Sequence, residues 1–119
     1  MLPKVTQLFE LPQILPDAAF EPEIFETLAE GNGIKIERII SKGHVTKSEF
    51  WYEQNTDEWV MLLQGTAILL FDQDSGEELT LHTGQAILIP AYRRHRVIFT
   101  STKPPCVWLA IHANFTNAS

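Results

Sequence analysis

Turn residues interrupt the second half of this chain about every ten residues, and this spacing restricts its possible folds more than any other feature. Between the turns lie short apolar segments rich in β-branched and aromatic side chains, as strands are. Strands do not alternate with long helical segments, which argues against a parallel sheet. The pattern predicts an all-β antiparallel sandwich or barrel. The predicted strands are EWVMLL, TAILLF, ELTLHT, QAILIP, HRVIFT and CVWLAIHA.

The beginning of the chain has a different character, because four prolines make a long helix there unfavourable. These prolines are Pro3, Pro12, Pro16 and Pro22. They predict an extended N-terminal arm. We expect the arm to touch the core through four apolar side chains, Leu8, Phe9, Leu11 and Ile14.

Two further segments, FETLAE and IKIERII, flank the turn signal GNG at residues 31–33 and predict a β-hairpin. A short helix over residues 23–30 is the alternative, since Glu, Leu and Ala favour helix. The predicted organisation is a single domain. Residues 1–33 form the arm and the first hairpin strand, and residues 34–119 form the barrel.

Composition narrows the range of partners. The 119 residues are 45% apolar, which is enough for one core, and their net charge of -6 argues against binding to nucleic acid or anionic lipid. No apolar run has the length of a membrane helix, and the first residues lack a secretory signal, so we expect a cytoplasmic protein. The lone cysteine, Cys106, is expected to be a small apolar filler in a strand.

Three polar side chains precede the first strong strand. Tyr52, Gln54 and Glu58 are spaced by even numbers, so they share one face if the segment is extended. A buried carboxylate without a partner is very costly, and Glu58 should therefore be neutralised, hydrogen-bonded or bound to a cation. His95, which begins the strand HRVIFT, is the expected companion.

Five positions in two separate stretches, Glu58, Gly65, Gly84, Pro90 and His95, are spaced as in the two motifs of the cupins. From about residue 34 to 113 the chain resembles the small single-domain bacterial cupins, with their recurring WYEQ and DEW segments. The resemblance implies a double-stranded β-helix, also called a jelly roll. It also implies a homodimer and an active site within the barrel.

The chain departs from the family at the first motif. Tyr52 and Gln54 stand where the family has two metal-binding histidines, so the motif is degenerate. Tyr92 replaces a glycine of the second motif, and Phe99 replaces an asparagine. An amide oxygen is a weaker ligand than imidazole, and a phenol is protonated near neutral pH.

The resemblance therefore implies a weak divalent-metal site, for Zn, Fe, Ni or Mn, with Gln54, Glu58 and His95 as ligands. Tyr52 is the candidate acid or base, and together with His112 it is a candidate ligand-binding residue. The alternative is a metal-free network of hydrogen bonds among the same side chains.

The remaining histidines and the arginines carry weaker expectations. His44 and His82 are predicted at the surface. A basic island near the mouth of the barrel would either steer a carboxylate-bearing ligand inward, or form a solvated rim or ion pairs with the many acids. Three tryptophans are predicted in the core or in dimer contacts. The basic island consists of Arg93, Arg94 and Arg96. The three tryptophans are Trp51, Trp59 and Trp108.

Two functions fit these features. The first is an enzyme that uses the metal on a small oxygen-rich molecule, because the cupins include dioxygenases, isomerases, decarboxylases and lyases. The second is a cupin that has lost its metal site and binds a small ligand without turnover. A fold alone does not choose between them.

Overall fold

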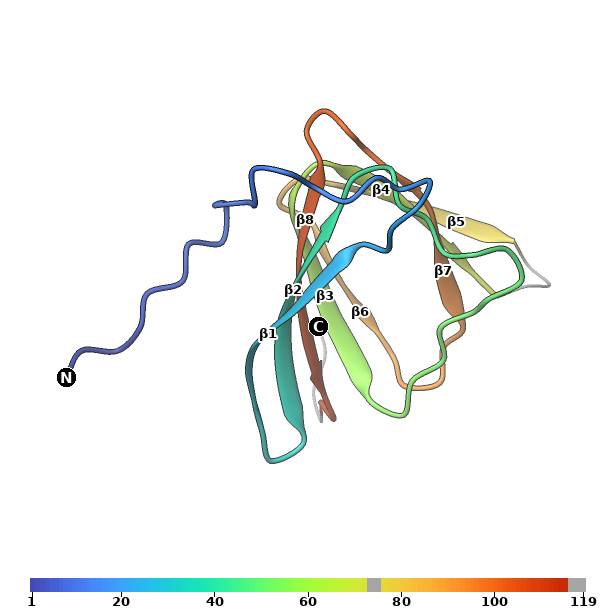
Figure 1. Cartoon of the computed structure of the whole chain (residues 1–119). Coiled ribbons are helices and arrows are strands. Elements are labelled where there is room, and N and C mark those ends of the chain that lie inside the picture. Colours follow the sequence, from blue (N-terminus) through green and yellow to red (C-terminus); the bar gives the residue numbers. More distant parts are fainter. Residues whose placement is uncertain (73–75, 116–119) are drawn as a thin grey trace.

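The chain forms two antiparallel sheets (Figure 1). The structure, a computed structural model, describes residues 1–72 and 76–115. Strands are the only regular elements in this part of the chain, so the predicted hairpin is correct and the alternative helix over 23–30 is wrong. The strands are β1 (Ile24–Gly31), β2 (Ile34–Ser41), β3 (Asp57–Gln64), β4 (Thr66–Phe71), β5 (Glu77–His82), β6 (Ala86–Ile89), β7 (His95–Thr100) and β8 (Cys106–Ala113).

The two sheets face each other and enclose the core. One sheet has the order β1-β2-β8-β3-β6 and the other β5-β4-β7, so strands distant in sequence lie side by side, as in a jelly-roll barrel (Figure 1). The predicted all-β barrel is confirmed. Residues 73–75 and 116–119 of the predicted barrel lie outside the described residues.

Alternation along β3 decides what faces inward. Glu58, Val60 and Leu62 are buried, whereas the intervening side chains are partly exposed. Leu69 from β4 and Trp108 from β8 complete the same core. Because Glu58 has the same parity as the core residues, the fold itself carries its carboxyl group inside. Cys106 is fully buried, as predicted.

Gly65 joins β3 to β4 in a backbone conformation that side chains disfavour, with φ +99°. A Cβ atom there would lie 2.8 Å from the Cys106 Sγ atom and 2.8 Å from the Ser101 Oγ atom. The glycine of the first motif is therefore required by both the conformation and the close packing of this turn.

The N-terminal arm is anchored by one arginine. Arg38 on β2, only 7% exposed, donates hydrogen bonds from Nη1 to three backbone carbonyls of the arm. Its Nε and Nη2 atoms contact the Glu26 carboxylate of β1, at 2.7 Å for the closest pair. The carbonyls belong to Gln7, Leu8 and Glu10.

The apolar side chains of the arm contribute less than predicted. Leu8 and Leu11 are half-buried, but Phe9 and Ile14 are 61% and 88% exposed, so the expected core contacts of those two are wrong. Backbone carbonyls bound to a buried guanidinium hold the arm instead. The first residues extend away from the barrel (Figure 1).

No helix in the described ranges is long and apolar enough to cross a membrane.

Candidate functional site

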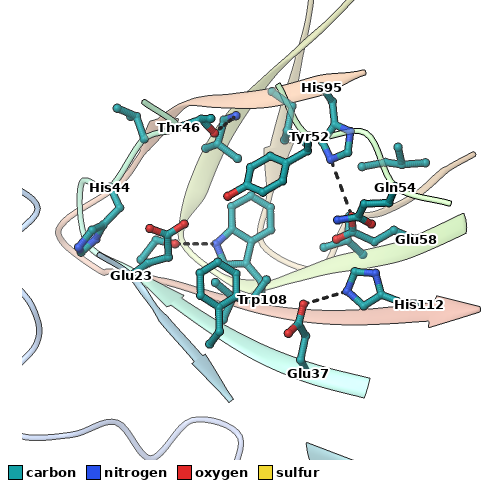
Figure 2. Close-up of a pocket in the computed structure, with 18 residues that line it drawn as sticks. Glu23, Glu37, His44, Thr46, Tyr52, Gln54, Glu58, His95, Trp108 and His112 are labelled. Carbon is teal, nitrogen blue, oxygen red and sulfur yellow. Dashed lines mark hydrogen bonds and ion pairs between the residues drawn. The ribbon is translucent and has the colours of Figure 1, made fainter. Parts of the chain in front are cut away.

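A cavity of about 80 Å³ lies between the two sheets. Side chains from β2, β3, β7 and β8 line it, together with the segment before β3 (Figure 2). It has room for roughly five to eight water-sized groups, and hence for a small molecule. The five predicted site residues all line this cavity: Tyr52, Gln54, Glu58, His95 and His112.

Glu58 contributes a buried carboxyl group to the lining of the cavity. It is 8% exposed, and no hydrogen bond to its carboxyl group occurs within residues 1–72 and 76–115. The Nε2 atom of His95 lies 3.8 Å from its Oε1 atom. Burial raises the pKa of Glu58; the charge of His112 lowers it and that of Glu37 raises it further. Glu58 is thus a buried carboxyl group directed into a cavity.

His95 presents an unprotonated nitrogen to Glu58. Its Nδ1 atom donates to the carbonyl oxygen of Arg93 at 2.9 Å, so in the neutral ring the lone pair is on Nε2. Burial lowers the pKa of His95, which favours that neutral form, although the bond to Arg93 acts in the opposite direction. The ring stacks on Tyr52, with 5.7 Å between centroids. His95 is held in one orientation with Nε2 facing the cavity.

Tyr52 and Gln54 are placed by backbone contacts that leave their side chains free. Tyr52 exchanges two backbone hydrogen bonds with His95, of 2.8 and 3.1 Å, and the Gln54 carbonyl accepts one from the Tyr92 amide at 2.6 Å. Tyr92 has φ +65°, a conformation that glycine adopts more readily than other residues, which fits the glycine expected at this position of the second motif. In the described part of the chain, neither the Tyr52 hydroxyl nor the Gln54 side-chain amide has a hydrogen bond.

The phenol of Tyr52 stays protonated. Burial raises its pKa above 10.0, and the charges of Glu23, Glu58 and Glu37 raise it further. Tyr52 is therefore a hydrogen-bond donor to whatever occupies the cavity.

His112 points into the cavity, a direction that its place in the sequence does not determine. Its Nε2 atom lies 2.8 Å from Oε1 of Glu37, on the neighbouring strand β2. The hydrogen bond to Glu37 raises the pKa of His112, and the same bond lowers the pKa of Glu37. Glu37 is 7% exposed and was not predicted, since the only sign of it in the sequence is one acid among the apolar residues of IKIERII.

His44 is buried, so its predicted surface position is wrong. It is 5% exposed and lines the cavity. Its Nδ1 atom accepts a hydrogen bond from the Lys42 amide at 2.8 Å, and its Nε2 atom lies 3.1 Å from the Glu21 carbonyl. The segment that carries His44 folds back onto β7, where the Thr100 hydroxyl donates to the His44 carbonyl at 2.6 Å, and a loop sequence does not reveal this contact. His82 is exposed, as predicted.

The basic island does not face the cavity. Arg93 pairs with Asp72 at 2.9 Å, while Arg94 and Arg96 lie over the ring of Trp51. None of the three lines the cavity. The expected role in steering a ligand is therefore not supported, and Arg93 has the expected role of an ion-pair partner. Trp108 is in the core, as predicted, and also lines the cavity.

The side chains in the cavity that could act as metal ligands suit a weak metal site better than a fully coordinated one. Within the described residues no group of three or more His, Cys, Asp or Glu side chains could hold a metal ion. Glu58 and His95 face each other, but His112 is already bound to Glu37. Gln54 adds a neutral oxygen donor, which binds divalent ions weakly.

The sequence model of the Cupin domain family matches residues 38–112. The chain belongs to the cupin family. A similar solved structure is that of a protein from Ralstonia eutropha JMP134, described as a candidate mannose-6-phosphate isomerase. It is 40% identical over 95% of this cupin and 100% of that chain, with a TM-score of 0.81.

More distant structures share the fold alone. A cupin superfamily protein from Desulfitobacterium hafniense DCB-2 is 21% identical, covers 92% of this chain and 100% of its own, and has a TM-score of 0.64. The TT1209 protein from Thermus thermophilus is 19% identical over 84% of this chain and 90% of that one, with a TM-score of 0.65. A search of curated proteins finds no match.

Proposed function

We propose that this cupin binds a small oxygen-rich molecule in its cavity and that Glu58 exchanges a proton with it. One observation carries the proposal: the buried carboxyl group of Glu58 has no hydrogen bond within the described residues and faces open space. Such a group is costly to the fold, and a ligand would satisfy it. The free side chains of Tyr52 and Gln54 add a donor and an amide beside it.

The chemistry that fits is general acid–base catalysis. A raised pKa brings the carboxyl group closer to neutrality, where it can both take and return a proton. Glu58 would take a proton from a carbon next to a carbonyl and return it, while the Tyr52 hydroxyl donates a hydrogen bond to the carbonyl oxygen. The description of the Ralstonia relative as a candidate isomerase supports a proton-transfer reaction of this kind.

Hydrogen–deuterium exchange into dihydroxyacetone, followed by NMR in deuterated buffer, tests this proposal. The wild-type protein should speed exchange next to the carbonyl, and Glu58→Gln should slow it by about a hundredfold. Glu78→Gln, an exposed carboxylate on β5, is the matched control and should behave as wild type. Equal rates for wild type and Glu58→Gln would rule out the proton transfer. Binding without exchange would support the alternative, a non-catalytic cupin.

A weak divalent-metal site is the second candidate, and the orientation of His95 favours it. The Nε2 lone pair faces Glu58 across 3.8 Å, and Gln54 lines the same space. A bound metal would supply a Lewis acid to polarise an oxygen of the ligand. Metal analysis of protein purified without a histidine tag or chelator decides this. Less than about a tenth of an equivalent, unchanged in His95→Ala, would reject the site.

We also propose a homodimer. The face of the larger sheet that points away from the cavity carries half-buried apolar side chains, among them Trp59, Met61 and Ile111. The arm exposes Met1 and Leu2. A second copy of the chain would cover both the outer face of this sheet and the exposed residues of the arm. Light scattering should give twice 13.5 kDa, and a monomer mass would contradict the proposal. A cytoplasmic location stays a prediction.

A further inference from the structure

The cavity is lined by acids and by no lysine or arginine side chain among the described residues. Glu23, Glu37 and Glu58 contribute three carboxyl groups. Lys35 reaches Glu37 at 3.7 Å, but it is 45% exposed and does not line the cavity. An anionic ligand would meet repulsion here and find no arginine or lysine to bind it.

The histidines offset only part of this negative charge. His112 pairs with Glu37, so these two groups neutralise each other. The His95 Nε2 atom lies 3.8 Å from the Glu58 Oε1 atom, too far for a hydrogen bond. Glu23 and Glu58 have no lysine or arginine beside them among the described residues that line the cavity.

Aromatic rings lie at the same end of the cavity as Glu23. Figure 2 shows Glu23, Tyr52 and Trp108 close together, away from Glu58 and His112. The Trp108 Nε1 atom donates to the Ser41 Oγ atom at 3.2 Å, so its polar edge is satisfied and its ring is available for packing. Phe25 adds a third ring to the lining. Aromatic faces beside a carboxylate are the surroundings that bind ammonium groups.

The other end of the cavity requires a polar ligand group. There the Glu58 carboxyl, 8% exposed, and the Gln54 side-chain amide lie side by side (Figure 2) and have no hydrogen bonds within the described residues. A hydroxyl or carbonyl group could contact both. The cavity therefore has two chemically different ends.

We propose that the ligand of this cupin is a small organic cation that also carries a hydroxyl or carbonyl group. Its ammonium group lies against Glu23, Phe25 and Trp108, and its oxygen faces Glu58 and Gln54. The proposal rests on the cavity being the binding site, as under the proposed function. It predicts that a phosphate ester, such as the one named for the Ralstonia relative, does not bind here.

Isothermal titration calorimetry with three probes of similar size tests the charge. The probes are choline, its neutral isostere in which carbon replaces nitrogen, and hydroxybutyrate as the anion. Choline should bind about tenfold more tightly than the isostere, and hydroxybutyrate should not bind. Binding of hydroxybutyrate as tight as that of choline, equal binding of the isostere, or no binding of choline would each overturn the inference.

Two variants test whether Glu23 is responsible for the preference for choline. Glu23→Gln should weaken choline binding several-fold and leave the isostere unchanged, whereas the exposed control Glu78→Gln should change neither. A loss of choline binding in Glu78→Gln equal to that in Glu23→Gln would overturn the assignment. If the isostere or the anion binds best and Glu58→Gln abolishes that binding, the cavity remains the site. Only the inferred ligand charge would then be wrong.

Discussion

The Glu58 Oε1 atom and the His95 Nε2 atom face each other at 3.8 Å, too far for a hydrogen bond. Both side chains are buried, and the acceptor nitrogen and the carboxyl group point into the same cavity. A purely structural pair would be expected to close this gap, because buried polar groups are normally hydrogen-bonded. The separation is what makes the cavity a candidate binding site.

Replacing Glu58 by an apolar residue should stabilise the fold while it destroys the site. Glu58→Leu removes a buried group without a hydrogen bond, and we expect the free energy of unfolding to rise by about 1 kcal/mol. Glu37→Leu, on β2, leaves buried His112 without its partner and should lower the free energy of unfolding by about 2 kcal/mol. Urea unfolding measures both. A loss of stability in Glu58→Leu would show that the carboxyl group has a structural role.

The pair of His112 and Glu37 should make stability depend on pH. The raised pKa of His112 stabilises the fold below its usual value of 6.5, and this is lost as the pH rises through the raised value. The lowered pKa of Glu37 stabilises the fold above 4.5, and this is lost on acidification. The pair therefore contributes most to stability between pH 4.5 and pH 6.5.

His112→Gln should then reduce the stability that the protein loses between about pH 6 and about pH 8, because neutral glutamine does not titrate. Urea unfolding at both pH values gives the comparison. An identical loss in wild type and variant would contradict the assigned pKa directions.

The turn at Gly65 should tolerate no side chain. Gly65→Ala combines a φ of +99° with a contact of 2.8 Å to the Cys106 sulfur, and we expect a loss of about 3 kcal/mol. Gly76→Ala has a comparable positive φ but open space around the new Cβ atom, so its loss should be about 1 kcal/mol. Thermal unfolding compares the two, and equal losses would mean that the close contact is unimportant.

Arg38 should hold the N-terminal arm against the barrel. Arg38→Met removes its hydrogen bonds to the arm and to Glu26, and we expect a loss of about 2 to 4 kcal/mol and faster proteolysis within residues 1–10. Arg94→Met, which loses the contact with Trp51, should cost less than about 1 kcal/mol. An arm equally resistant to protease in both variants would contradict the anchoring.

Local patterns were sufficient to predict the barrel. Alternating apolar residues in β3 and the glycine at 65 report directly on strand and turn, because both depend on neighbouring residues alone. The same alternation placed Glu58 inward. The barrel and its inward carboxyl group therefore follow from short stretches of the sequence.

Contacts between distant segments could not be predicted. Glu37 meets His112 across 75 positions of sequence, and His44 is buried because its own segment folds back on β7. Arg38 finds its partners in the arm about 30 residues upstream. Each depends on the pairing of strands, which one sequence does not specify.

The pKa of the Glu58 carboxyl group, measured by NMR on protein with carbon-13 in its glutamate carboxyls, tests the central claim most directly. Glu58→Gln assigns the signal. A group that is buried and has no hydrogen bond should titrate above 4.5, and an added ligand should shift the signal. A pKa at or below 4.5 would mean that the carboxyl group is solvated or already paired, which would contradict the account.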